Sequence, residues 1–284
     1  MLNLLLAVLF STAILVAFKL FPRLGIRVMP AITINYVVAV TFGILQADGE
    51  PNLSSFVGKA WLPLALIVGL TFIITFYLYA ASTQRVGVAL TSVAARMSVV
   101  IPVLLGLWLF RDPLPVLKLA GLLLALVAVY LTFKKEGHIV LTASAVLFPL
   151  LLFLGNGTND SLMKVVEHYY IRDDFEEFLT VVFFVALLTG ILASLVKRER
   201  GQGVFHSRDL LAGLILGLLN WYSTYFFMSG MAFFDISVYV PLVSVSVVSL
   251  SALLGMFLFR ERLSVVNLAG IGLALVSITL IASA

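Results

Sequence analysis

The sequence predicts an all-α integral membrane protein whose ten transmembrane helices form two inverted five-helix repeats. Composition predicts the membrane class, because 62% of the 284 residues are hydrophobic and only 11% are charged. An average soluble domain has roughly 25% charged residues. An internal repeat predicts the arrangement of the helices. No polar stretch between the apolar runs is long enough to form a separate soluble domain.

Ten apolar stretches have the length of a membrane-spanning helix, which needs about 20 residues. Charged or turn-forming breaks separate them. In chain order the predicted spans are 2–21, 28–46, 61–83, 86–110, 114–133, 139–163, 177–196, 209–231, 235–259 and 264–283. The first stretch has no basic residue before its apolar core and no small-residue cleavage site, so we expect a retained helix and not a signal peptide.

The repeat is visible in two segments that align without a gap. Leu104–Leu131 matches Leu253–Leu280 at an offset of 149 residues, with 16 of 28 positions identical. The shared blocks LLG, LFR, LAG and LALV include glycine and arginine in register, so we divide the chain into repeats 1–136 and 137–284. Because five is odd, the two copies enter the membrane from opposite faces, as in transporters whose substrate site lies near the midplane between the halves.

Lysine and arginine counts predict the orientation. The connections after spans 1, 3, 5, 7 and 9 carry twelve of these residues, and the connections on the other side carry five. Basic residues favour the cytoplasmic side. We therefore expect a multi-pass protein of the cell inner membrane with both termini outside.

The blocks LFRDPLPVLKLAG and LFRERLSVVNLAG resemble the end of the fourth helix and the start of the fifth in EamA-type members of the drug/metabolite transporter superfamily. Pro102 matches the family's mid-helix proline, while Ser251 at the equivalent position departs from it; Asp112 and Glu261 match the family's loop acid. The resemblance covers essentially the whole chain and implies a ten-helix transporter. It implies no particular substrate, because these motifs are structural, and its members usually have both termini in the cytoplasm.

Arg96 is the one charged residue deep inside a predicted span. It lies ten residues after Val86 and fifteen before Arg111, roughly 15 Å from the nearer end of the helix. A central arginine costs about 2.5–3.5 kcal/mol on insertion scales. Its side chain cannot reach the membrane surface, so we expect it to face the protein interior. Two interpretations stand: a structural tether between helices, or a group that binds substrate or gates the transporter.

Polar residues of other spans fall at the depth of Arg96. Counted from the same face, that layer contains Thr12, Thr75, Asn220 and Ser249. Helical spacing extends it to further candidates on spans 3, 8 and 9, namely Tyr79, Thr224 and Ser244. We assign these residues to substrate binding by their convergence, although serine and threonine also pack membrane helices together.

The sixth span carries a second polar run, GNGTNDSLMK. Asn156, Asp160 and Lys164 are four residues apart and share one helix face, so Asp160 and Lys164 can form an ion pair. Asn156 is the nearest of the three in depth to Arg96, and we expect a direct contact. Asp160 and Lys164 are coupling or gating candidates at the opposite mouth, or a simple ion pair at the helix end.

These features predict a secondary active transporter of a small metabolite, preferably an amino acid or another organic anion, because a guanidinium binds carboxylate or phosphate bidentately. The alternatives are an exporter of cationic or hydrophobic drug-like compounds and a flippase for a lipid-linked substrate. An enzyme is not expected, since the deep charged group is an arginine, which cannot deprotonate. With no cysteine and three loop histidines, we expect no metal and no cofactor. The expected partners are the substrate, the bilayer and a coupling proton or ion, not nucleic acid; the chain is a monomer or a homodimer.

Overall fold

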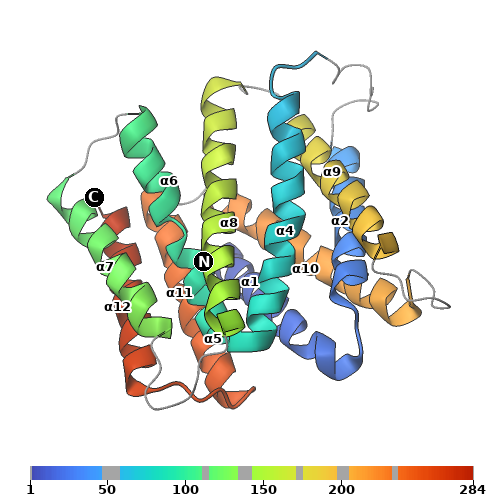
Figure 1. Cartoon of the computed structure of the whole chain (residues 1–284). Helices are drawn as coiled ribbons and strands as arrows, with labels where there is room; N and C mark the ends of the chain where they lie inside the picture. The colour runs from blue at the N-terminus through green and yellow to red at the C-terminus, as the bar shows by residue number, and fades with distance from the viewer. Residues whose placement is uncertain are drawn as a thin grey trace. The chain divides into compact units, whose positions relative to one another are not determined.

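The computed structural model describes residues 2–46, 58–110, 115–133, 143–170, 175–196, 205–231 and 236–283 (Figure 1). Every regular element within these ranges is helical. In chain order the helices are α1 (Leu2–Leu20), η1 (Phe21–Leu24), α2 (Val28–Gln46), α4 (Leu62–Val86), α5 (Val88–Met97), α6 (Val100–Leu105), η2 (Gly106–Phe110), α7 (Val116–Phe133), α8 (Ala143–Tyr169), α9 (Phe175–Val196), α10 (Ser207–Met231), α11 (Ile236–Phe257) and α12 (Val265–Ala282).

The helices coincide with the ten predicted spans, the fourth of which is divided among α5, α6 and η2. Within the described part of the chain, seven stretches are long and apolar enough to cross a membrane, and two shorter apolar helices cover Val116–Thr132 and Leu242–Phe257. The all-α prediction is therefore confirmed. The inverted relation between the two repeats remains a prediction.

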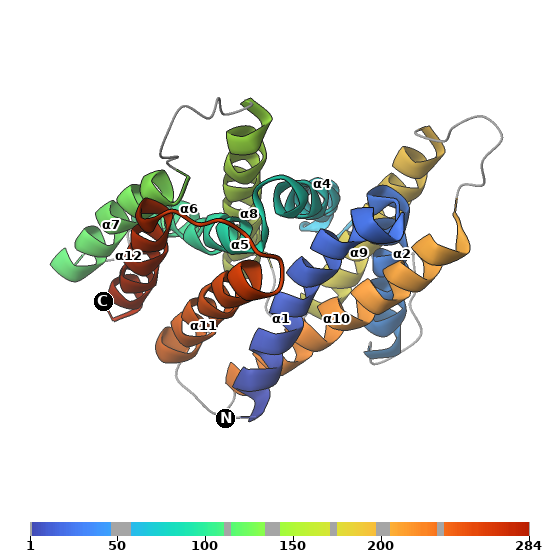
Figure 2. The ribbon, with the colours of Figure 1, turned by 90° about the horizontal axis from the view of Figure 1, so that it is seen from below.

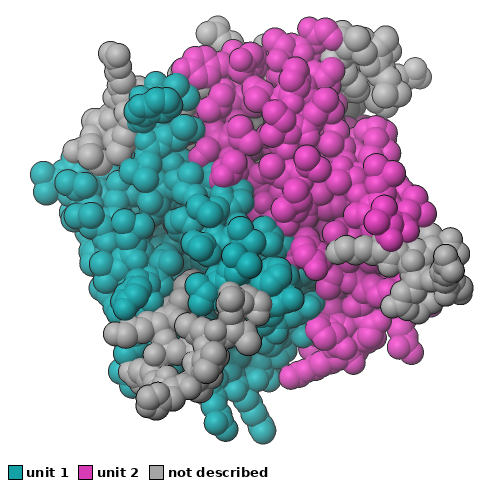
Figure 3. All heavy atoms as spheres, viewed as in Figure 1, with its two compact units in different colours: residues 1–19, 78–157, 222–284 teal, residues 20–77, 158–221 magenta. Residues whose placement is uncertain are grey.

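The chain packs into two compact units (Figure 3). Unit 1 comprises residues 1–19, 78–157 and 222–284, and unit 2 comprises residues 20–77 and 158–221. Helices α4, α8 and α10 contribute residues to both units. This division follows packing, so it does not test the division into sequence repeats at 136/137.

Unit 1 has its core between α5, α7, α11 and α12, with α7 and α12 side by side (Figures 1 and 2). Its buried apolar side chains are Ala89, Val93, Met97, Val100, Leu122, Ala125, Ala128, Val248, Ala252, Ile271, Ala274 and Ile278. Small residues bring α7 and α12 close together. A Cβ on Gly270 would lie 2.4 Å from the backbone nitrogen of Thr132, the kind of close approach that membrane helices use in place of a hydrophobic driving force.

Unit 2 is built around the α2–α9 pair. A second cluster joins α4, the end of α8 and α9, where the Trp61 ring meets the Phe178 ring edge-on at 5.7 Å. Asp209 in the first turn of α10 is 1% exposed and pairs with Arg27, whose backbone N–H also donates to Asp209 Oδ1 at 2.9 Å. A carboxylate at a helix N-terminus is favoured by the helix dipole, so this pair ties α10 to the start of α2.

The fourth span is interrupted immediately after Arg96. The helix α5 ends at Met97 and α6 begins at Val100; Ser98 and Val99 between them keep helical backbone angles, with φ of −55° and −53°, so the break is a tightened turn and not an unwound segment. Pro102 has no N–H to donate to the carbonyl of Ser98, and its ring crowds that carbonyl. Instead the Ile101 N–H donates to Ser98 O at 2.9 Å, a tighter turn than an α-helix makes. The family-type proline thus produces a break at the depth of the arginine.

Candidate functional site

Arg96 lies in the last turn of α5 and is partly buried. Its neighbours in sequence point to two different packing clusters. Ala95 packs with Leu78 and Leu152, whereas Met97 packs in the core of unit 1. Successive residues of a helix are rotated by about 100°, so the Arg96 side chain projects into the sector between these clusters. The C-terminal end of α5 carries partial negative charge, which favours a cation there.

The guanidinium of Arg96 is incompletely satisfied. Its Nε is buried and has no hydrogen-bond partner among the described residues, and none of the ion pairs within them involves Arg96. A buried donor without a partner costs about 1–3 kcal/mol, and more for a charged group. The site is therefore arranged to accept an additional acceptor, such as an anionic ligand or ordered water.

Asn156 on α8 contacts the residues on either side of Arg96. Its Nδ2 donates to Ala95 O at 3.1 Å and to Ser98 Oγ at 2.8 Å. The expected direct contact with the Arg96 guanidinium is not among the hydrogen bonds of the described residues. Asn156 instead fixes the backbone where the fourth span breaks. One residue later, Gly157 lets α8 approach closely, because a Cβ there would lie 2.4 Å from Ile101 Cδ1.

The opposite end of α5 is held by a carboxylate from a distant part of the chain. Glu261 Oε1 accepts from the Val88 N–H at 2.8 Å, and Oε2 accepts from the Ala89 N–H at 3.3 Å. Lys19 at the end of α1 lies 3.2 Å from Glu261 Oε1 and also donates to Thr83 O. Glu261 therefore accepts hydrogen bonds from two N–H groups that have no partner within their own helix, and at the same time balances the charge of Lys19.

The turn after α11 places this carboxylate. Arg260 adopts a left-handed backbone conformation, with φ of 54°, and the Glu261 N–H donates to Gly255 O at 2.8 Å. Two glycines make room for the side chain: a Cβ on Gly87 would lie 2.3 Å from Glu261 Oε1, and a Cβ on Gly255 would lie 2.5 Å from Oε2. The carboxylate thus lies in a cradle that any other residue at these positions would fill.

Because Lys19, Glu261 and the start of α5 meet, they give three helices of unit 1 a common reference level. From this level Arg96 is eight residues along α5, about 12 Å. Thr12 is seven residues from Lys19, about 10 Å, and Ser249 is eight residues from the end of α11, about 12 Å. These three predicted residues therefore lie at comparable depths within one unit.

Three buried hydroxyls of unit 1, those of Thr12, Thr132 and Ser251, have no partner among the described residues, and two of them lie on α1 and α11. Thr12 is 1% exposed and Ser251 is 0% exposed, and the Oγ1 of the first and the Oγ of the second are unsatisfied. Val8 on α1 packs against Val247 on α11. Thr12 and Ser251 each lie one turn further along these helices, so both hydroxyls follow the same α1–α11 contact.

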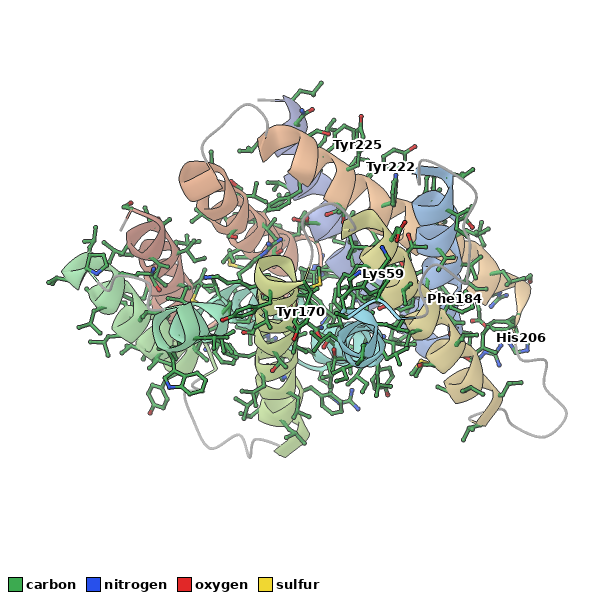
Figure 4. All side chains as sticks on the ribbon, turned by 90° about the horizontal axis from the view of Figure 1, so that it is seen from above. Lys59, Tyr170, Phe184, His206, Tyr222 and Tyr225 are labelled. Atoms are coloured by element: carbon green, nitrogen blue, oxygen red, sulfur yellow. The ribbon has the colours of Figure 1, made fainter. Side chains whose placement is uncertain are left out.

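The other predicted residues of unit 1 are less enclosed. Ser244 is 8% exposed and Ser249 is partly buried on α11. Tyr79 packs beside Leu78 in the cluster that contains Ala95. Thr224 is exposed on α10. The same turn of α10 presents Tyr222, whose ring lies 5.6 Å from that of Phe10, and Tyr225 (Figure 4).

Thr75 and Asn220 belong to unit 2, and each takes part in an amide contact. Asn159 Nδ2 donates to Thr75 Oγ1 at 3.1 Å, and Asn220 Nδ2 donates to Asn35 Oδ1 at 3.3 Å. Asp160 is exposed and Lys164 partly buried on the second half of α8. Their predicted gating roles, and a single layer joining all the candidates, remain predictions.

Four residues that sequence reasoning did not assign to the site are prominent in the structure. Asn159 is 5% exposed, and its Oδ1 has no partner among the described residues; it was hidden within a polar run. Lys19 at the end of α1 pairs with Glu261. Glu261 was matched only to the family's loop acid, and Gly87 was not singled out; the one available signal was an acid and a glycine at span ends.

No group of three or more metal-ligating side chains occurs within the residues that the structure describes. A second ion pair of unit 2, between Lys59 and Glu177 at 3.6 Å, is far more exposed than the Glu261 contact, with 33% and 41% of the side chains accessible (Figure 4). The Glu261 contact therefore differs in kind from a surface pair, whose net contribution to stability is small.

Comparison with known proteins bears on the fold and the family. The EamA-like transporter family matches residues 1–134. A protein of Haemophilus influenzae described as uncharacterized is 26% identical over 277 residues, which cover 95% of this chain and 93% of that protein. One protein crystal structure covers 98% of this chain and 94% of its own, with a TM-score of 0.63 and 14% identity. The resemblance to the drug/metabolite transporter superfamily is confirmed by the family match.

Proposed function

We propose, from the premise that residues 1–134 match the EamA-like transporter family of the drug/metabolite transporter superfamily, that this chain is a secondary transporter of a small metabolite. The preferred cargo is an amino acid or another organic anion. Transport occurs by alternating access between two inverted five-helix repeats. The observation that carries the proposal is Arg96, a cation with a buried and unpartnered Nε beside a break in its own helix.

The chemistry of the site supports an anionic cargo. A guanidinium offers a planar fork of donors that matches a carboxylate. Discontinuous membrane helices form the substrate sites of many secondary transporters, and here the tightened turn at Ser98–Val99 lies next to the arginine. The hydroxyls of Thr12 and Ser251 add neutral donors in the same unit. A lone arginine suits one carboxylate better than a phosphate dianion.

The alternative cargo classes fit this arrangement less well. An exporter of cationic drug-like compounds needs a free carboxylate to bind its substrate, and Glu261 in unit 1 is occupied by Lys19 and the start of α5. A flippase for a lipid-linked substrate needs a groove that opens toward lipid. Counterflow of a labelled solute in liposomes indicates a carrier, and a large continuous current would indicate a channel.

Arg96→Ala tests the proposal. Charge-assisted hydrogen bonds contribute about 1.5–3 kcal/mol, so we expect substrate affinity to fall about 10- to 100-fold. A thermal-shift screen of amino acids and other organic anions identifies the ligand, since one that binds only the native state raises the apparent stability. Liposome counterflow with that ligand then measures transport. We expect the Arg96→Lys protein to bind the substrate little better than the Arg96→Ala protein, because the point charge of a lysine does not reproduce the planar fork of donors.

The matched control is Arg85→Ala. Arg85 is exposed on α4, and its guanidinium lies 3.8 Å from the centre of the Phe148 ring. We expect the control to retain both binding and counterflow. Full activity of Arg96→Ala would exclude a binding role for Arg96, and equal losses in the two variants would indicate a general effect of removing a cation.

A further inference from the structure

The helix α5 is a ten-residue rod with a joint at each end. At its start, Gly87 has φ of 101°, a backbone conformation that residues with a side chain rarely adopt. At its end, the Ser98–Val99 turn interrupts the span. Between these joints, Ala89 and Val93 pack against α11 residues in the core of unit 1. The rod carries Arg96 next to its second joint.

Contacts from other segments hold both joints. Asn156 holds the second one through Ala95 and Ser98. Glu261 holds the first one by accepting from the Val88 and Ala89 N–H groups. Glu261 belongs to the second sequence repeat, whereas α5 and Lys19 belong to the first. The carboxylate therefore joins the two repeats at one end of the rod.

We propose that Glu261 is a positioning residue for Arg96 and acts as a latch on α5. While the carboxylate holds the start of α5, the rod remains packed and the end of unit 1 between α1, α5 and α11 is closed. When the carboxylate leaves Val88 and Lys19, the rod turns about the Ser98–Val99 joint. This movement opens that end and changes the direction in which Arg96 is presented.

The charges and the space around Glu261 favour two distinct positions of the start of α5, held or released, over a gradual loosening of its contacts. The carboxylate satisfies two helix N–H groups and one ammonium together, and its side chain is 9% exposed. Gly87 and Gly255 leave no room for another side chain in the cradle. Losing the carboxylate therefore exposes all three partners at once, and water replaces it only when the segments separate.

This latch regulates the Arg96 site and in that respect rests on the proposed function. Its test needs no substrate, so its failure would leave the transport proposal standing. The chain contains no cysteine, which allows a single reporter thiol. Ser92 is suitable, because it lies on α5 four residues before Arg96 and is 1% exposed.

The experiment measures the labelling of Ser92→Cys by a charged maleimide in purified protein in lipid nanodiscs. Glu261→Gln keeps the shape and an acceptor oxygen but removes the charge that attracts Lys19 and the helix start. Losing a hydrogen bond to a charged group shifts an equilibrium constant about tenfold or more, here the one between the closed and the open position of α5. We expect Glu261→Gln to accelerate labelling by about that factor.

Asp209→Asn is the matched control. Asp209 is also a buried carboxylate in an ion pair, and its side chain is 1% exposed. It lies in unit 2, however, and it pairs with Arg27, not with a residue of α5. We expect it to leave the labelling rate of the Ser92→Cys protein unchanged. An unchanged rate in a folded Glu261→Gln protein would overturn the proposal, as would an equal acceleration by Asp209→Asn.

Lys19→Met provides a second, independent variant if Glu261→Gln fails to fold. It removes the ammonium and leaves the two backbone contacts of Glu261 intact. We expect Lys19→Met alone to accelerate labelling, by less than about tenfold, and an unchanged rate would overturn the proposal. Where Glu261→Gln folds, we expect no further acceleration when the two changes are combined, because both act on one latch. Fully multiplicative effects in the double variant would contradict a shared latch.

Discussion

Asn156 shows how one polar side chain can stabilise a broken membrane helix. A break leaves backbone carbonyls without their helical donors, and in a bilayer water cannot replace those donors. Asn156 donates from the neighbouring helix to the carbonyl of Ala95 and to the hydroxyl of Ser98, which itself donates to Ala95 O at 2.6 Å. The side chain therefore helps to hold the turn between α5 and α6.

We predict that Asn156→Ala destabilises the protein by about 1–3 kcal/mol, because two part-buried hydrogen bonds are lost and Ala95 O keeps only the Ser98 hydroxyl as a side-chain donor. Thermal unfolding in detergent measures the change. Thr279→Ala is the control, since the Thr279 hydroxyl is exposed and donates only to Leu275 O of its own helix. Equal stability of the Asn156→Ala protein and the wild type would show that the two hydrogen bonds contribute nothing.

Individual residues differ in how far the sequence revealed them. Arg96 was identifiable because a charge inside a span is costly wherever its partners lie. Glu261 and Lys19 are at span ends, where charges are inexpensive and common, so no penalty marked their contact. Their pairing depends on which helix ends meet in three dimensions. Only the structure brings the end of α1, the start of α5 and the turn after α11 together.

Among the helices, the fourth span is the one that departs from a regular form. Hydropathy predicted a single span over 86–110, and the structure divides it at Ser98. The matching span of the second repeat has Ser251 where this one has Pro102, and α11 runs unbroken from Ile236 to Phe257. The positions of helices thus followed from apolar length, but the break depended on one residue that lacks an N–H.

We predict that Pro102→Ala mends the break. The new N–H at position 102 can donate to Ser98 O, so the turn at Ser98–Val99 should become continuous helix. Backbone hydrogen exchange over residues 98–103 is expected to slow about tenfold or more, because each added helical bond must open before exchange. Counterflow should fall in the same protein, since Arg96 would no longer lie beside a joint.

Ser251→Ala is the matched control for that variant. It changes the equivalent position of the second repeat, where the helix is already continuous and the hydroxyl has no partner among the described residues. Its hydrogen exchange should match that of the wild type. If Pro102→Ala leaves exchange unchanged, the break has another cause than the missing N–H.

At the level of the whole chain, the sequence predicted an all-helical membrane protein and the positions of its helices, but not their packing. The repeat divides the chain at 136/137, whereas the packing divides it within α4, α8 and α10. A sequence repeat reports which helices resemble each other. Packing depends on which small residues allow close approach, as Gly213 does at Ile34 and Gly270 at Thr132. Such pairings are not readable from one chain without its structure.

The orientation of the chain in the membrane depends on the basic residues of all its connections taken together. Twelve of the seventeen loop lysines and arginines follow odd-numbered spans, and basic residues favour the cytoplasmic side. Lys19 and Arg27 are paired with carboxylates. They still count toward the bias, because acidic residues contribute little to it. We therefore predict both termini outside, although EamA-type proteins usually have them in the cytoplasm.

Single thiols in the cysteine-free chain decide between these orientations. Ser283→Cys at the end of α12 and Leu24→Cys after α1 are both exposed positions, and neither change removes a charge. With an impermeant maleimide applied to spheroplasts, we expect Ser283→Cys to react and Leu24→Cys to react only after the membrane is permeabilised. The reverse pattern would place both termini in the cytoplasm. The latch at Glu261 would then face the exterior, because Glu261 pairs with Lys19 at the end of α1.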